Sequence, residues 1–243
     1  MTYCVAMLLT EGVLLASDSR TNAGVDHIAT FRKMHLFQDN SDRRIVLVSA
    51  GNLATTQSVI SLLQKQVVHD DENILSLHTL YDVATLVGKT VREVIARDSG
   101  QQAQGNGIDY SCSFILGGQI RGETPRLFNI YAQGNFIEAT HDTPYFQIGE
   151  SKYGKPIIDR VIHYETPLAQ AVKCALISFD STIRSNLSVG PPIDVLLHRN
   201  NDFTAREPYR FDEYHPYLQQ LRTAWGVGLN QLFGSLPEIN IEN

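Results

Sequence analysis

The chain has 243 residues, of which 43% are hydrophobic and 19% charged, and its formal net charge at pH 7 is -6. This composition is typical of a globular protein with one sizeable core, and because Lys and Arg are scattered we expect no nucleic-acid partner. Since the chain has neither a run of 18 apolar residues nor a basic secretory start, we expect a cytoplasmic protein without a membrane partner.

The cysteine, histidine and glycine patterns indicate no bound group. Cys4, Cys112 and Cys174 lie in apolar runs without CxxC spacing, which favours buried, reduced thiols. The eight histidines are dispersed and form no HExxH motif, so we predict no metal and no cofactor. Gly117-Gly118 has no P-loop lysine after it and is interpreted as a turn.

The first hundred residues predict a set of strands followed by two helices. Two apolar runs separated by Thr10-Glu11-Gly12 suit a hairpin of buried strands, and a second pair flanks the turn-forming residues 39–42. Apolar residues then recur at helical spacing, and the second helix should end before Ser99-Gly100. The expected strands are 3–9, 12–18, 34–38 and 44–49, and the expected helical segments are 59–67 and 80–95.

The second half of the chain repeats this order. Short β-type runs with Gly-containing turns follow a polar loop at 101–106, and helical spacing then returns. The expected strands are 110–116, 126–131, 136–139, 145–148 and 193–197, and the expected helical segments are 153–162 and 168–183. Each half can lay a helix pair over a sheet, so we predict an α+β fold, a four-layer αββα sandwich, over residues 1–200.

Residues 201–243 are predicted to form a C-terminal extension. Its first part is polar, and apolar residues then recur at helical steps. Gly226 and Gly228 disfavour an unbroken helix there. Such a helix could pack on a neighbouring subunit or on its own body. Its apolar positions are Leu218, Leu221, Trp225, Leu229 and Leu232.

Thr2 is the first candidate for chemistry, because it directly follows Met1. Removal of Met1 would leave a threonine whose hydroxyl can attack a carbonyl and whose free α-amine can accept the proton. Free α-amines titrate at roughly 7.7 to 8.0, close to working pH. A small residue after Met1 is also common in proteins without chemistry at that end, so Thr2 alone is a weak signal.

A set of short motifs strengthens the case for Thr2 as a catalytic residue, because together they resemble the catalytic half of proteasome β-type subunits. The motifs are Thr2, Ser17-Asp18-Ser19-Arg20, Ala23-Gly24, Arg32-Lys33 and Ser49-Ala50-Gly51. The resemblance extends through Ile148-Gly149 to about residue 200 and implies the fold of N-terminal nucleophile hydrolases. Threonine directly after Met1, the Thr-Tyr opening and the long extension look most like Anbu, a bacterial proteasome-related subclass.

The resemblance implies a role for each matching residue. Thr2 would be the nucleophile, Lys33 the cation that eases its deprotonation, and Asp18 the carboxylate that orients Lys33. Gly51 would supply the oxyanion N–H, and Ser188 matches a family serine near the nucleophile's amine. From the residues alone, a structural ion pair is favoured over catalysis for Asp18 and Lys33, and Gly51 could be a turn glycine; the joint match to the family reverses that order.

The substrate pocket is expected near three further residues. Its first-site wall is predicted around Ala23, Phe31 and Asn52. The segment between Gly24 and Lys33 is one residue shorter than in the usual subunit, which would reshape this pocket.

Two positions depart from the family pattern. Glu150 stands where a serine is usual, and Ser185 stands where an aspartate is usual. Glu150 could replace the lost carboxylate, or it could cap a helix beginning near Ser151, which we favour.

The expected function is a threonine peptidase or amide hydrolase that works through an acyl-enzyme on Thr2. Its substrate would be a peptide or related amide, and the resemblance implies a homo-oligomer, either a ring or an open helical assembly. A structural assembly subunit with little turnover and an amidase of small non-protein amides are the alternatives. The sequence identifies no unfoldase partner.

Overall fold

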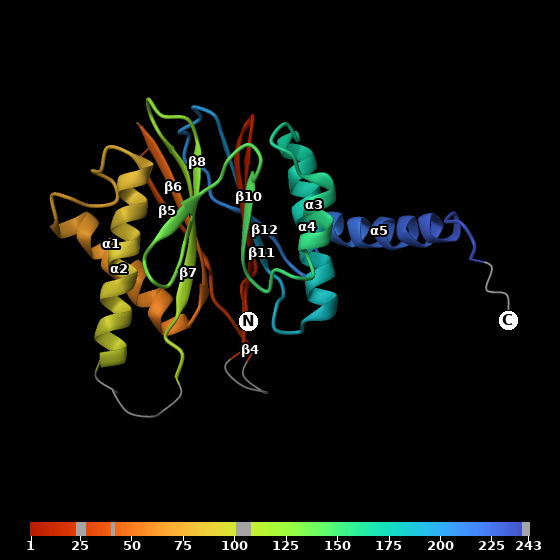
Figure 1. The fold of residues 1–243 in the computed structure, drawn as a ribbon, viewed down its shortest axis with the longest axis horizontal. Helices are drawn as coiled ribbons and strands as arrows, with labels where there is room; N and C mark the ends of the chain where they lie inside the picture. Colours follow the sequence, from red (N-terminus) through yellow and green to blue (C-terminus); the bar gives the residue numbers. More distant parts are fainter. Residues whose placement is uncertain (23–27, 40–41, 101–107, 240–243) are drawn as a thin grey trace.

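Two five-stranded antiparallel sheets form the centre of the molecule (Figure 1). The structure is a computed structural model and describes residues 1–22, 28–39, 42–100 and 108–239. One sheet has the order β10-β1-β2-β11-β12 and the other has the order β5-β6-β7-β8-β9. Within these ranges, no helix is long and apolar enough to cross a membrane.

The strands of the first sheet come from both ends of the chain. Its hairpin β1–β2 pairs Cys4 with Ser17 and Leu9 with Gly12, and β10 and β11 flank it on either side. The N-terminal strand therefore lies inside the sheet, hydrogen-bonded along both edges. The bounds are β1 Tyr3–Leu9, β2 Gly12–Ser17, β10 Tyr145–Gly149, β11 Ile193–Arg199 and β12 Tyr209–Phe211.

The second sheet is a meander in which each strand pairs with the next in the chain. Its longest strands, β6 and β7, pair over their full lengths, from Arg43 opposite Ile120 to Gly51 opposite Cys112. The bounds are β5 Met34–Asp39, β6 Arg43–Gly51, β7 Cys112–Ile120, β8 Arg126–Ile130 and β9 Phe136–Glu138.

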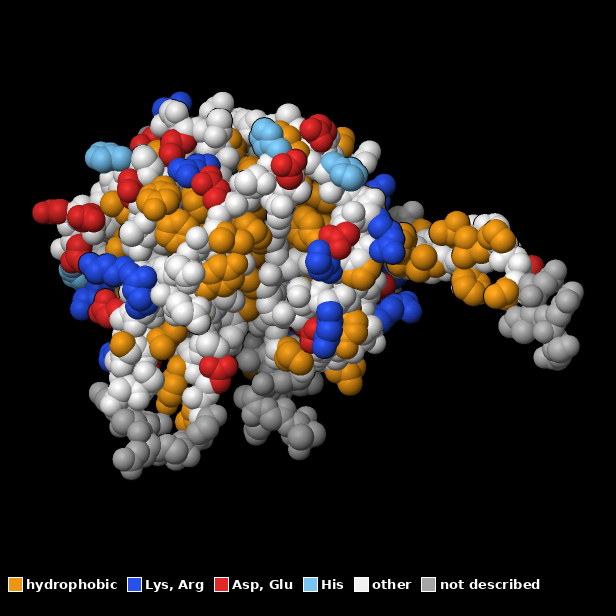
Figure 2. Space-filling view, viewed as in Figure 1, with side chains coloured by type: hydrophobic (Ala, Val, Ile, Leu, Met, Phe, Trp, Pro, Cys, Tyr) orange, Lys and Arg blue, Asp and Glu red, His pale blue; other side chains and the backbone are white. Residues whose placement is uncertain are grey.

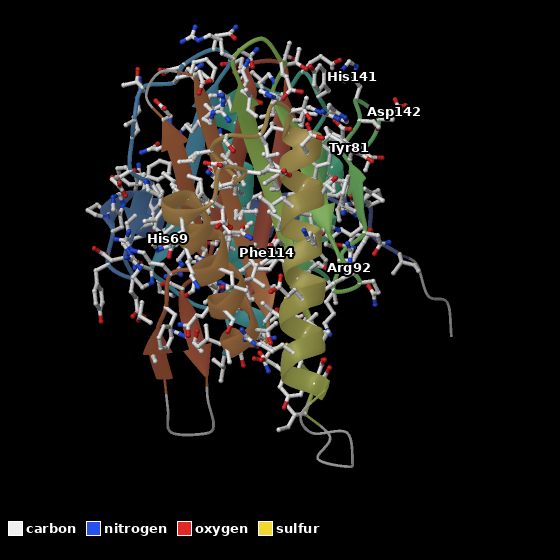
Figure 3. The ribbon with its side chains drawn as sticks, turned by 90° about the vertical axis from the view of Figure 1, so that its left-hand side faces the viewer. His69, Tyr81, Arg92, Phe114, His141 and Asp142 are labelled. Carbon is white, nitrogen blue, oxygen red and sulfur yellow. The ribbon has the colours of Figure 1, made fainter. Side chains whose placement is uncertain are left out.

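Helix pairs cover the outer faces of the two sheets. Helices α1 (Leu53–His69) and α2 (Leu80–Gly100) lie side by side over the second sheet, with Phe114 behind them in Figure 3. Helices α3 (Lys155–Val161) and α4 (Leu168–Ser185) lie against the first sheet (Figure 1). The order of elements predicted from the sequence is therefore present.

Side-chain alternation in β1 explains why this strand is buried on both faces. Tyr3, Val5, Met7 and Leu9 join the cluster beneath α3 and α4. The intervening residues, such as Ala6, face the second sheet and join the cluster between the sheets. A strand that is covered on both faces reads as a continuous apolar run, as residues 3–9 do.

Two local predictions are wrong. Gly117 and Gly118 lie within β7 rather than in a turn. A Cβ at Gly117 would lie 3.1 Å from Leu127 Cδ1 and 3.3 Å from Leu15 Cδ1, so the glycine permits close approach of the two sheets. Helix α2 also continues through Gly100 rather than ending before Ser99.

The chain after β11 adds one more strand to the first sheet and then forms a projecting helix. Strand β12 pairs with β11, and α5 (Pro216–Gly234) projects from the body with apolar side chains along its surface (Figures 1 and 2). The helix runs unbroken through Gly226 and Gly228, contrary to the expectation from their low helix propensity. Among its residues, Leu218 is buried, whereas Leu232 and Phe233 are exposed.

Candidate active site

A buried ion pair joins the first hairpin to the second sheet. Lys33 Nζ lies 2.7 Å from Asp18 Oδ1 and also donates to the Arg20 carbonyl at 2.7 Å. Both side chains are almost wholly buried. A buried ion pair is maintained only when further hydrogen bonds satisfy its remaining atoms.

The backbone around Asp18 supplies those hydrogen bonds. The Tyr3 N–H donates to Oδ1 at 3.1 Å and the Gly190 N–H donates to Oδ2 at 3.3 Å. Burial raises the pKa of the Asp18 carboxyl, and the Lys33 ammonium and these two N–H groups act in the opposite direction. Asp18 therefore ties together β1, the segment after β2 and the loop before β11.

Thr2 immediately precedes β1 and Tyr3, whose N–H donates to Asp18, and is 8% exposed. Its carbonyl accepts from the Glu150 N–H at 2.7 Å. Gly149, the last residue of β10, has a φ of 81°, and a Cβ there would lie 2.0 Å from the Thr2 oxygen. Glycine at this position is therefore required for the backbone to hold Thr2.

A cavity of about 520 Å³ opens in front of Thr2. Lys33 and Gly51 also line it, so the structure brings three of the predicted catalytic residues to one space. The other lining residues are Met1, Thr21, Arg32, His35, Ser49, Ala50, Leu53, Thr56, Gln57 and Gly149. Among the described residues, no group of three or more His, Cys, Asp or Glu side chains is placed to hold a metal ion.

Gly51 ends β6 where the chain turns into α1. Its φ is 109°, in the region that favours glycine, and a Cβ would lie 2.5 Å from the Ser111 carbonyl oxygen. Any other residue would both strain the backbone and push β7 away. The backbone at the cavity wall is thereby fixed in one conformation.

Ser188 lies in the loop between α4 and β11, close to the residues that hold Asp18. Its N–H donates to Asn186 Oδ1 at 2.9 Å. The neighbouring Leu187 carbonyl accepts from Arg20 at 3.0 Å, and Gly190 reaches Asp18. The loop therefore supports the Ser17–Arg20 segment from one side.

The two described residues of the predicted substrate wall, Phe31 and Asn52, are not among the residues that line the cavity. Ala23 lies outside the described residues. Phe31 is exposed, and its N–H donates to the Ser19 carbonyl. Asn52 caps α1 by accepting from the Thr55 N–H at 3.2 Å. Phe31 and Asn52 precede the lining residues Arg32 and Leu53, and their contact with substrate stays a prediction.

The cavity contains residues that sequence reasoning did not select. His35 lines it from β5, and burial lowers the pKa of His35 to about 4, so the ring is neutral near pH 7. Thr56 and Gln57 line it from the first turn of α1. His35 lies in β5, two residues after Lys33, which immediately precedes that strand. Residues two apart in extended chain point to the same side, and that spacing could have identified His35.

Glu150 does not cap a helix as we favoured from the sequence. Helix α3 begins at Lys155, and the Glu150 carboxylate instead accepts from Asn186 Nδ2 at 2.9 Å. Asn186 was not predicted as a site residue from the sequence. It lies between Ser188 and Ser185, the position at which the family usually has an aspartate. Its side chain connects Glu150 to the Ser188 backbone.

Comparison with known proteins gives a consistent picture. The family described as proteasome subunit matches residues 2–196. A solved structure of Anbu (ancestral beta-subunit) from Yersinia bercovieri is 58% identical, with a TM-score of 0.92 over 100% of both chains.

Two further Anbu structures are similar over nearly the whole chain. One, described as the helical assembly of the Anbu complex from Pseudomonas aeruginosa, is 54% identical with a TM-score of 0.94 over 98% of both chains. Anbu from Hyphomicrobium sp. strain MC1 is 45% identical, with a TM-score of 0.89 over 99% of this chain and 100% of that chain. No curated protein sequence matches.

Proposed function

The chain belongs to the proteasome subunit family and groups with Anbu within it, and on that premise we propose that it is a threonine hydrolase of peptide or amide bonds. Its fold is that of a four-layer αββα sandwich of the N-terminal nucleophile type with a C-terminal extension. The observation that carries the proposal is the common cavity of Thr2, Lys33 and Gly51, with Asp18 bonded to Lys33.

Removal of Met1 would free the α-amine of Thr2, which is the base of the proposed reaction. The Thr2 hydroxyl attacks the carbonyl carbon of the scissile amide, and its proton passes to the α-amine. Lys33 stabilises the negative charge that develops on the threonine oxygen, and the Gly51 N–H is proposed to hold the oxyanion. The C–N bond breaks as the α-ammonium protonates the departing amine.

The second half of the reaction regenerates the enzyme. Water attacks the ester on Thr2 and gives a proton to the same α-amine. The bond between the acyl carbon and the Thr2 hydroxyl oxygen breaks, the carboxylic acid leaves, and the proton on the α-amine returns to the Thr2 oxygen.

Self-association is the second part of the proposal. The exposed apolar side chains of α5, including Leu232 and Phe233, suit a contact with another copy of the chain. A helical assembly is described for the Pseudomonas aeruginosa relative. We propose a cytoplasmic homo-oligomer, a ring or an open helix, in which α5 contributes subunit contacts.

The direct test is covalent labelling with a threonine-reactive β-lactone or epoxyketone, followed by intact mass. The wild-type chain should lose Met1 and gain one probe mass, and Thr2→Ala should gain none. Thr10→Ala, which changes a threonine at the far end of the hairpin, is the matched control and should label normally. Labelling of Thr2→Ala to the wild-type extent would contradict the assignment.

An assembly subunit with little turnover is the second candidate, and the exposed apolar face of α5 favours it. In that case the chain would assemble without reacting with the probe. Intact mass of the purified oligomer separates the two candidates, because retained Met1 blocks the α-amine.

A further inference from the structure

Glu150 is a buried residue whose backbone is hydrogen-bonded to Thr2. It follows Gly149 at the end of β10, and its N–H donates to the Thr2 carbonyl at 2.7 Å. Gly149 pairs with Tyr3 in the register of β1 and β10, so Glu150 lies opposite Thr2, and β10 ends at Gly149, whose φ is positive.

The partners of the Glu150 carboxylate leave it weakly compensated. Its side chain is 7% exposed. Oε2 accepts from the neutral amide of Asn186 at 2.9 Å, and Oε1 lies 3.7 Å from Nζ of Lys152, whose side chain is 69% exposed. A buried carboxylate is stable when a close cation and several donors surround it, and an exposed lysine at this distance is a poor partner.

The N-terminus of the mature chain would supply a better cation. The Thr2 nitrogen is separated from the Thr2 carbonyl oxygen by three bonds, and that oxygen is already hydrogen-bonded to Glu150. While Met1 is present this nitrogen is an uncharged amide. Removal of Met1 creates an ammonium group next to the residue that carries the under-compensated carboxylate.

We propose that Glu150 is a positioning residue that holds the α-ammonium of Thr2 once Met1 is removed, and that Asn186 orients it for this contact. The inference rests on the proposed function in one respect, the exposure of Thr2. Glu150 acts through the α-amine and touches no reacting carbon.

The other charged groups around Thr2 do not supply this contact. Asp18 is engaged by Lys33, so this pair adds little net charge. His35 is neutral near pH 7, and Arg32 at the cavity wall and Lys152 beside Glu150 are cations that oppose an ammonium. Of these charged groups, Glu150 is thus the carboxylate without a buried cationic partner.

The expected consequence is a dependence of the site on pH. A nearby carboxylate favours the charged form of an amine and so raises its pKa. The α-amine can accept the hydroxyl proton only when it is neutral, so Glu150 shifts the onset of activity to higher pH. In its absence, the enzyme would become active at lower pH.

The test compares the wild-type chain with Glu150→Gln, each with Thr2 as the first residue by intact mass. The α-amine is titrated through its rate of carbamylation by cyanate against pH, which requires no substrate. We expect its apparent pKa to be lower by about one unit in Glu150→Gln. Glu165→Gln, at an exposed glutamate of the body, is the matched control and should leave the titration unchanged.

A second variant, Glu150→Asp, separates loss of the charge from loss of folding. Glu150→Asp keeps the charge but withdraws it by one methylene, and the apparent pKa should fall by a smaller amount. Identical titrations in wild type, Glu150→Gln and Glu150→Asp would overturn the inference.

The acidic limb of the plot of kcat/KM against pH shows whether the titration of the α-amine controls activity. It should move with the titration in Glu150→Gln. If the titration shifts but no variant reacts with the β-lactone, the proposed function fails and Glu150 keeps its role at the amine. If labelling occurs with no shift between variants, the function stands and this inference fails.

Discussion

The two ends of the chain are built on opposite principles. At the N-terminus, a buried charge has several partners, because Asp18 accepts from Lys33, from Tyr3 and from Gly190. At the C-terminus, α5 carries apolar groups that have no cover, with Leu218 as its buried residue. The buried charge near the N-terminus finds its partners within the subunit. Helix α5 near the C-terminus instead exposes apolar side chains, which proteins normally bury.

This contrast suggests different roles for the N-terminal site and for α5. Buried, hydrogen-bonded charges fix geometry, which is what a nucleophile requires. Exposed apolar side chains gain stability only when another surface covers them. We therefore expect substitutions at the N-terminal site to alter chemistry and subunit stability together, and substitutions in α5 to alter association with little effect on either.

Replacing Lys33 tests the first half of the comparison most strongly. In Lys33→Met the Asp18 carboxylate stays buried without its cation, which should lower the free energy of unfolding by about 3–5 kcal/mol. The value of kcat/KM should fall at least about a hundredfold, because the charge beside Thr2 is lost.

Urea denaturation and steady-state kinetics measure both effects of this change. Lys65→Met, at an exposed lysine of α1, should stay within about 0.5 kcal/mol of wild type. Equal stability of Lys33→Met and wild type would show that the pair is not needed for folding.

A buried histidine tests whether polar groups elsewhere in the body behave in the same way. His198 in β11 is 0% exposed and its Nε2 lies 3.0 Å from Gln119 Oε1. Burial lowers the pKa of His198 to about 4. Its contribution to stability is fully present above its unfolded pKa and is lost as the pH falls from about 6.5 toward 4.

The expected loss across that window is on the order of 3 kcal/mol for His198. Urea denaturation at several pH values would show a shallower pH dependence in His198→Gln than in the wild type. His69→Gln changes an exposed histidine and should keep the wild-type slope. Parallel slopes in all three proteins would contradict the assignment.

Two glycines with similar backbone angles separate strain from steric contact. Gly51 has a φ of 109° and no room for a Cβ, whereas Gly122 has a φ of 96° and nothing within 4 Å of a Cβ. Gly51→Ala should lose about 1–3 kcal/mol of stability and about a hundredfold or more in kcat.

Gly122→Ala should lose at most about 1–2 kcal/mol and keep its activity. Thermal melts and kinetics on the pair measure the difference. Retained activity in Gly51→Ala would remove the Gly51 N–H from the mechanism.

The smallest effect on the subunit is expected at the end of α5 and just after it. Replacing Leu232, Phe233 and Leu236 by Gln should change the stability of the body by less than about 0.5 kcal/mol per site, because all three are exposed. Sedimentation velocity should show smaller assemblies than for wild type. Gln231→Ala is the control on the same helix, and assemblies unchanged by the triple substitution would place the subunit contact elsewhere.

The sequence predicted the elements that have strong periodicity. The continuous apolar run of β1 and the helical spacing of α2 and α4 reflect burial, and burial is what those patterns report. Met34–Asp39 and Arg43–Gly51 were also located to within two residues.

Elements that depend on distant contacts were missed. The short strands β3 (Arg20–Asn22) and β4 (Ile28–Thr30) pair with each other over three residues, too few to show a pattern. Strand β12 lies in a polar run and exists because β11 offers it an edge. The burial of Gly117 between the sheets likewise follows from Leu15 and Leu127, which are distant in sequence.

The candidate site shows the same division. Thr2, Asp18, Lys33 and Gly51 were identified through a resemblance, and the structure brings them together. Thr56, Gln57 and Asn186 were not identified, because their roles depend on how the first turn of α1 and the end of α4 meet the first hairpin.

The place of β1 between β10 and β2 has a practical consequence for handling this protein. A chain terminus is usually the loosest part of a fold, and affinity tags are attached there for that reason. Here the first residues are held along both edges by neighbouring strands and open directly into the cavity. A fusion at the N-terminus would block the α-amine that the proposed mechanism uses, and one at the C-terminus would follow α5. An epitope inserted at the exposed β7–β8 turn near Gly122 would avoid both ends.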